Sequence, residues 1–258
     1  MLAVKVENLT KYFGDKKVLD NLSFEVYRGE IFALIGHNGA GKTTTLRILS
    51  GIIKDFEGRV IKNGTSGYLP EERGLYKNET VYSLLKFFGE LAEVSNLDKK
   101  IDYWLNRFNI SKYKNYKIKE LSKGNQQKVQ LIISLIHNPD ILILDEPFSG
   151  LDVVNVKLFI DVLTELKKDN KAIIISSHRL EYLDKICDRA LILKNGKAIY
   201  YGALKFRDKV YIEILENNKI VKKEMPIEEA INILKNYPEK VIKYEIKKSL
   251  EDIFLETY

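Results

Sequence analysis

The sequence has few residues that could crosslink the chain, and it has no long apolar segment. Cys187 is the one cysteine among 258 residues, so no internal disulfide can form. It lies in the apolar pattern of a helix, which favours a small buried side chain over a reactive thiol. No apolar run approaches the roughly 18 residues that span a bilayer, and the start, MLAVKVENLTKYFG, lacks the apolar run of a signal peptide. The sequence therefore predicts a soluble protein that is not exported.

The distribution of charge along the chain does not favour a nucleic-acid partner. The chain has 42 basic and 36 acidic residues, a net charge of +6, and they are spread along the sequence. No basic stripe is interleaved with aromatic residues, so no nucleic-acid partner is expected. A hydrophobic content of 45% is enough for a full core, and the length fits one large domain, alone or with a smaller one.

Short apolar runs alternate with helical patterns over most of the chain. The runs lie at residues 31–35, 61–70, 141–147 and 172–178. Strands that alternate with helices predict an α/β fold with a mostly parallel sheet. Residues 75–138 carry helical patterns only, which predicts a helical subdomain inserted into that sheet.

The pattern changes after Gly202. The stretch VYIEILENNKIVKKEM alternates around an Asn-Asn pair and predicts a hairpin, and Pro226 then opens a helical pattern. A second alternating stretch, KVIKYEIKK, is followed by Ser249, a predicted helix cap. We therefore predict two domains, residues 1–202 and a small α+β accessory module over 203–258.

A glycine-rich loop gives the strongest motif. GHNGAGKTT, with a predicted strand before it and a helix after it, fits the phosphate-binding pattern G-x-x-x-x-G-K-[ST]. Backbone amides near Gly39 and Gly41 can surround phosphate oxygens, Lys42 can reach the β and γ phosphates, and the Thr43 hydroxyl can bind Mg²⁺. The predicted phosphate-binding residues are Gly36, His37, Asn38, Gly39, Ala40, Gly41, Lys42, Thr43 and Thr44. The His37 side chain itself is predicted to face solvent.

Two strand ends carry further candidates. ILILDEP places Asp145 and Glu146 at the carboxyl end of a buried strand, the edge at which open α/β sheets bind ligands. Next to a phosphate loop, Asp145 is the candidate Mg²⁺ partner and Glu146 the candidate base for an attacking water. His178 ends the next strand and is the candidate sensor of the γ-phosphate.

A second anion-binding segment reads LSKGNQQKV, at residues 121–129. Ser122 and Gly124 stand at the mouth of a predicted helix, a position that suits an anion. The phosphate that this helix binds is not evident from one chain folded on itself.

Taken in order, GHNGAGKTT, LSKGNQQKV, ILILDEP, SGLD at 149–152 and His178 resemble the ATP-binding subunits of ATP-binding cassette (ABC) transporters, over roughly residues 2–202. The resemblance implies a P-loop NTPase core with a mostly parallel sheet, an N-terminal antiparallel β subdomain and the inserted helical subdomain. It also implies an ATPase with ATP and Mg²⁺ as cofactors.

Several residue roles follow from this resemblance alone. Phe13 would stack on adenine, a contact that contributes about 1 to 3 kcal/mol for a base on an aromatic ring. Asp152 would organise a dimer interface. Glu71 stands where the family usually has glutamine, which places an extra carboxylate near Mg²⁺. Lys123 and Asn125 replace a glycine and the glutamine of the usual signature, and Lys123 either adds a cationic contact or points into solvent.

The resemblance also implies partners. In the family, two subunits pack head to tail, so that Ser122 and Gly124 of one contact the γ-phosphate held by the other. The partners would be a second copy or a homologous subunit and a separate transmembrane permease, with the chain at the cytoplasmic face of the cell membrane. YLPEERGLY and the ending SLEDIFLETY are similar to the ABC-2 subset of sodium or drug exporters. Two alternatives stay open: a soluble cassette ATPase in cofactor assembly, and a nucleic-acid or ribosome-associated cassette protein.

Overall fold

A six-stranded sheet forms the centre of the molecule. The computed structural model describes residues 1–72, 74–204, 209–216 and 219–246. The order of the central strands is β5-β6-β7-β3-β8-β9, and all are parallel except β9, which is antiparallel to β8. Their bounds are Ile31–Ile35 (β3), Ser66–Leu69 (β5), Ile141–Asp145 (β6), Ala172–Ser176 (β7), Arg189–Lys194 (β8) and Lys197–Ala203 (β9). Every residue of β3, β6 and β7 is buried, as their continuous apolar sequences require.

An antiparallel sheet of three strands covers one side of this centre. Its order is β2-β1-β4, with bounds Leu2–Phe13 (β1), Lys16–Tyr27 (β2) and Glu57–Lys62 (β4). Helix α1 (Lys42–Leu49) buries its apolar side chains in a core shared by both sheets. The predicted P-loop NTPase core with an antiparallel β subdomain is confirmed.

The predicted strand over residues 61–70 was wrong, because the chain turns in its middle. Lys62 ends β4 in one sheet and Ser66 begins β5 in the other. Gly64 has φ +131°, and a Cβ there would lie 2.5 Å from the Asp140 carboxylate, so no other residue fits. Asp140 also accepts a hydrogen bond from the Thr65 amide (3.0 Å), which fixes the turn.

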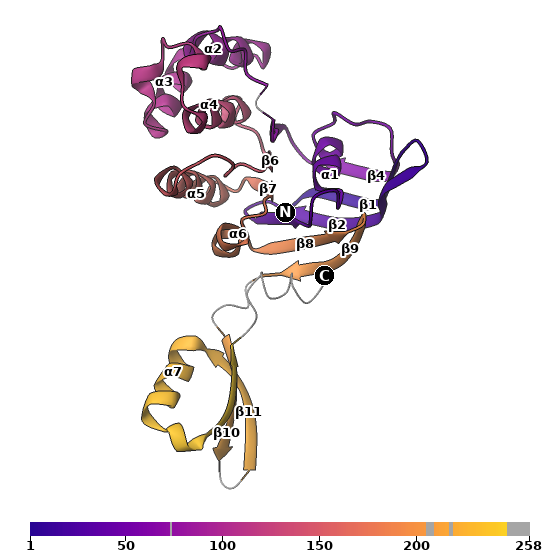
Figure 1. Ribbon diagram of the computed structural model, residues 1–258, viewed down its shortest axis with the longest axis vertical. Helices are drawn as coiled ribbons and strands as arrows, with labels where there is room; N and C mark the ends of the chain where they lie inside the picture. Colours follow the sequence, from indigo (N-terminus) through magenta and orange to yellow (C-terminus); the bar gives the residue numbers. More distant parts are fainter. Residues whose placement is uncertain (73, 205–208, 217–218, 247–258) are drawn as a thin grey trace.

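Helices cover the opposite side of the central sheet (Figure 1). Between β5 and β6 the described residues hold helices and no strands: α2 (Val81–Leu91), α3 (Leu97–Arg107), the short 3₁₀ turns Ser111–Tyr113 and Ile118–Glu120, and α4 (Lys123–Leu135). Helices α5 (Val153–Lys168) and α6 (Leu180–Ile186) follow β6 and β7. None of the helices in the described ranges is both long enough and apolar enough to cross a membrane.

The last described residues form a small sheet with one helix. Strands β10 (Lys209–Glu216), β11 (Lys219–Pro226) and β12 (Val241–Ile246) pair in the order β11-β10-β12, and α7 (Ile227–Asn236) joins β11 to β12. Their apolar side chains form a separate core of Val210, Ile212, Ile214, Met225 and Ala230. The predicted helix that Ser249 would cap lies outside the described residues.

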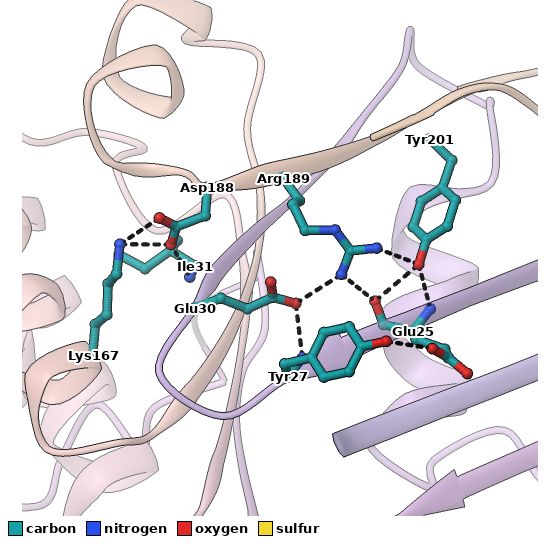
Figure 2. Close-up of polar contacts among 8 residues, drawn as sticks. All are labelled: Glu25, Tyr27, Glu30, Ile31, Lys167, Asp188, Arg189 and Tyr201. Carbon is teal, nitrogen blue, oxygen red and sulfur yellow. Dashed lines mark hydrogen bonds and ion pairs between the residues drawn. The ribbon is translucent and has the colours of Figure 1, made fainter. Parts of the chain in front are cut away.

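Polar side chains fix the start of β3, the strand that leads into the glycine-rich loop (Figure 2). Asp188 accepts a hydrogen bond from the Ile31 amide (3.0 Å) and forms an ion pair with Lys167 of α5 (2.6 Å). Beside it, the buried Glu30 carboxylate accepts from the Arg189 guanidinium (3.2 Å). Helix α5 and the β8 segment therefore hold β3 at the end opposite to the loop.

Asp140 gives stability a defined pH dependence. Its hydrogen bonds from Arg28 and from the Thr65 amide lower its pKa from 3.8 to about 2. The stabilisation is therefore complete above the unfolded pKa and is lost as the pH falls towards about 2. We expect Asp140→Asn to be less stable than wild type in urea at neutral pH, with a gap that narrows below about pH 4. The exposed Asp15→Asn is the control, and a gap for Asp140→Asn that does not change with pH would contradict the assignment.

Candidate nucleotide-binding site

The glycine-rich loop presents backbone amides at the start of a helix. Gly41 caps α1 with φ 108°, and no side chain caps the first amides of this helix. A Cβ on Gly41 would lie 2.5 Å from the Leu19 side chain, so glycine is required for the loop to pack this closely. Free amides and the helix dipole at one place form a site for an anion such as phosphate.

Lys42 lies across this loop. Its Nζ donates to the backbone carbonyl oxygens of Gly36 (2.6 Å) and of the next residue (3.2 Å), and its side chain is buried. Burial lowers the pKa of its ammonium group, while the carboxylates of Glu146, Asp145 and Glu71 act in the opposite direction. Lys42 is thus held at the loop by backbone carbonyl oxygens, with three carboxylates close enough to act on its charge.

Asp145 has one carboxylate oxygen that the protein leaves without a partner. Ser176 Oγ, at the end of the neighbouring strand β7, donates to Asp145 Oδ1 (2.5 Å). Asp145 Oδ2 is buried and has no hydrogen-bond partner among the described residues. A buried anionic oxygen without a donor is costly, and a hard divalent cation such as Mg²⁺ would satisfy it. The residues present therefore fit Mg²⁺.

Glu146 directly follows Asp145, and its backbone is in the left-handed region, with φ 50°. Its carboxylate is buried: Oε1 lies 2.9 Å from Nδ1 of His178, and Oε2 accepts from the His178 amide (3.4 Å). Burial raises the pKa of Glu146, and His178 and Lys42 partly offset that increase. A carboxylate with a raised pKa and a histidine partner is suited to accept a proton from water.

The phosphate loop and the residues at the ends of β6 and β7 line a cleft of about 340 Å³. It is lined by Val18, Asn38, Gly39, Gly41, Lys42, Thr43, Thr44, Glu71, Asp145, Glu146 and His178. A second hollow, of about 530 Å³, is lined by Gly36, His37, Asn38, Ser177 and His178 with Ile35 and Leu180. Within the loop, Ala40 is buried and His37 is exposed. The structure thus brings together the predicted phosphate-loop, metal and base residues.

Other predicted residues lie elsewhere. Ser122 and Gly124 do not line the cleft. Helix α4 lies in the helical subdomain, apart from α1 (Figure 1). Phe13 is 52% exposed, with Lys11 Nζ 4.9 Å from its ring centre, so it does not belong to the core. Asp152 caps α5 by accepting from the Asn155 amide (2.8 Å).

The sequence-based prediction missed three side chains near the cleft. Ser176 orients Asp145, and the Tyr68 hydroxyl is buried near Asp145 and Glu71. Gln130 of α4 donates to backbone carbonyls on both sides of Glu71. Signals for two of them were available: Ser176 ends a strand parallel to β6, and Gln130 is an amide within the apolar pattern of a helix.

Comparisons with known proteins identify the class. The family described as "ABC transporter" matches residues 19–149. An uncharacterised ABC transporter ATP-binding protein of Methanocaldococcus jannaschii, MJ1023, is 65% identical over 98% of both chains. The lantibiotic transport ATP-binding protein SrtF of Streptococcus pyogenes is 32% identical over 84% of this chain and 97% of its own. A solved structure of an ATP-binding subunit of an ABC transporter superposes with a TM-score of 0.79, at 25% identity, over 99% of both chains.

The chain therefore belongs to the ATP-binding proteins of the ABC transporter family. Cassettes of this family bind ATP and hydrolyse it, and the protein is accordingly an ATPase.

The role of Glu146 can be tested by replacing its carboxylate with an amide. Glu146→Gln keeps the size of the side chain but removes the base, so we expect turnover to fall by roughly 10² to 10⁴-fold. ATP affinity should stay close to that of wild type, because the phosphate loop is unchanged. Steady-state hydrolysis and equilibrium ATP binding measure the two effects. Glu181→Gln, an exposed change on α6, is the control, and wild-type turnover in Glu146→Gln would refute the assignment.

Proposed function

We propose that this ATPase dimerises around two Mg-ATP and powers a separate transmembrane permease, as part of an exporter of the ABC-2 type. One observation carries the proposal: the cleft contains the phosphate loop, the metal site and the base, while Ser122 and Gly124 do not line it. The cleft is thus one half of an ATP site. A second copy, or a homologous subunit, supplies the other half.

Each residue of the cleft has a role in this reaction. The loop amides and Lys42 bind the phosphates, and Thr43, Asp145 and Glu71 hold Mg²⁺, which when bound neutralises charge on the phosphate oxygens. Glu146 accepts the proton of the attacking water. The carboxylate of Glu146 orients His178, which contacts the γ-phosphate.

The signature helix is α4, which begins within the segment LSKGNQQKV. The surface around it has the properties of a dimer interface. Ser122 and Lys123 are exposed at the start of α4, whose first turn has no acidic residue, so it suits a partner's γ-phosphate. On the adjacent start of α5, Val153 and Val154 are 76% and 78% exposed. A second copy that covers these two valines would remove apolar surface from water and seal the ATP between the chains.

A hollow on the helical subdomain is the proposed contact with the permease. It has a volume of about 560 Å³, and its lining includes Tyr76, Lys77, Glu79, Leu84 and Phe87. Tyr76 and Phe87 are more than half exposed, so a cytoplasmic segment of the permease can bury both rings there. The same chain segment leads back to Glu71, which would place the ATP site under the influence of the permease. The direction of transport rests on the resemblance of YLPEERGLY to exporters.

The predicted module, residues 203–258, is proposed as an accessory unit outside the ATP site, except that its first two residues, Ala203 and Leu204, belong to the main domain. None of its described residues lines the cleft. Leu204 packs in the main core, and its amide donates to the Asp188 carbonyl oxygen (2.7 Å). A chain cut after Leu204 should therefore remain folded and bind ATP as tightly as the full chain. Loss of ATP binding in a truncated chain with native thermal unfolding would contradict this division.

Mixed dimers test whether each site is shared. Lys42→Ala damages one phosphate loop and Ser122→Arg blocks one signature, so each variant alone should be inactive. A mixed dimer has one intact site and one doubly damaged site. Random exchange makes about half of the dimers mixed, so recovered ATPase activity should reach at most roughly a quarter of wild type. A site built within one chain gives no recovery.

Mixed-dimer formation with ATP is confirmed by pull-down with two different tags. This control is needed because zero recovery would also result if both sites had to act together. The proposal fails when mixed dimers form and their single intact site protects the γ-phosphate no better than either parent does.

A further inference from the structure

Gln130 holds the backbone on both sides of Glu71. It lies on α4 and is 5% exposed. Its Nε2 donates to the carbonyl oxygen of Pro70 (2.9 Å) and to that of Glu72 (3.2 Å). One side-chain amide therefore binds the residue before Glu71 and the residue after it, and Glu71 itself remains free to line the cleft.

The oxygen atom of this amide has no structural explanation. Gln130 Oε1 is buried and has no hydrogen-bond partner among the described residues. A buried acceptor without a donor is unfavourable, and an apolar side chain at this position would avoid the cost. The adjacent residues of α4, Val129 and Leu131, are apolar and buried. The benefit of an amide at position 130 must therefore come from its donor side, which contacts the Glu71 segment.

The Glu71 segment and Gln130, which this contact joins, lie in parts of the molecule with different proposed roles. Glu71 lines the cleft together with Lys42 and Asp145. Gln130 lies on the helix that Ser122 caps, about two turns from its start. A contact between α4 and the Glu71 segment thus connects the metal side of one ATP site with the helix that would serve the partner's ATP.

We propose that Gln130 is a positioning residue, which orients Glu71 towards Mg²⁺ and makes that orientation depend on the position of the signature helix. The inference rests on the proposed roles of Glu71 at the metal and of α4 at the shared site. Gln130 acts through the backbone of its neighbours and does not contact the nucleotide.

A double-mutant cycle tests this in the full chain. Gln130→Met, Glu71→Gln and the double variant are each made in the Glu146→Gln background, which prevents turnover. The measurement is the Mg²⁺ concentration at which ATP binding is half-maximally strengthened. Removing the carboxylate, or the residue that orients it, should raise that concentration about tenfold, a size typical of groups that support a metal site. The double variant should be no worse than Glu71→Gln alone, because both changes remove one interaction.

Two further variants make the result specific. Ser134→Ala removes a buried hydrogen bond within α4, from Ser134 Oγ to the Leu131 carbonyl oxygen (2.7 Å), and should leave the Mg²⁺ dependence unchanged. Thermal unfolding checks that each variant is folded, and Gln130→Leu replaces Gln130→Met where the latter is not.

The outcomes separate this inference from the function it rests on. A shift in Glu71→Gln with no shift in folded Gln130→Met overturns the role of Gln130. Two shifts that multiply in the double variant also overturn it, since Gln130 would then act independently of Glu71. If Glu71→Gln causes no shift, Glu71 is not part of the metal site. The proposed function then loses this ligand, and Gln130 has no ligand to position.

Discussion

The whole site depends on the parallel pairing of β3, β6 and β7. Ile143 pairs with Ile174 and Ala33 with Ile175, so the three strands end at one edge of the sheet. The phosphate loop, the Asp145 and Glu146 pair, and the Ser176 to His178 segment meet there, although they are far apart in the sequence. Because β3 is also fixed at its other end by Asp188, the loop is carried by a strand held along its whole length.

The charges at this edge explain why the cleft suits a nucleotide with a metal. Asp145, Glu146 and Glu71 bring carboxylates close to Lys42, so a polyanion alone would meet repulsion as well as attraction. Mg²⁺ would resolve that conflict, because it supplies positive charge beside the phosphates and the unpartnered oxygen of Asp145 could help to hold it. Gln130 then adds control over the third carboxylate, which lies on a loop and not on a strand.

The sequence predicted those parts of the structure that follow from local pattern. The strand, glycine loop and helix around Lys42 were predictable because the motif fixes its own backbone, and Asp145 was predictable because it ends an apolar run. The break within residues 61–70 was not, since it depends on Asp140, which is distant in the sequence. Gln130 stands out as an amide within an apolar helical pattern, but its contact could not be predicted, because its partners are carbonyl oxygens, which carry no sequence signal.

The central claim is that one chain contains half of each ATP site, and the mass of the ATP-bound protein tests it most directly. Sedimentation velocity on Glu146→Gln, which should retain ATP, compares the protein with and without Mg-ATP. The account predicts a monomer without nucleotide and a dimer at saturating Mg-ATP, with Ser122→Arg added to the same chain returning it to a monomer. A protein that binds Mg-ATP fully and remains a monomer would contradict the claim.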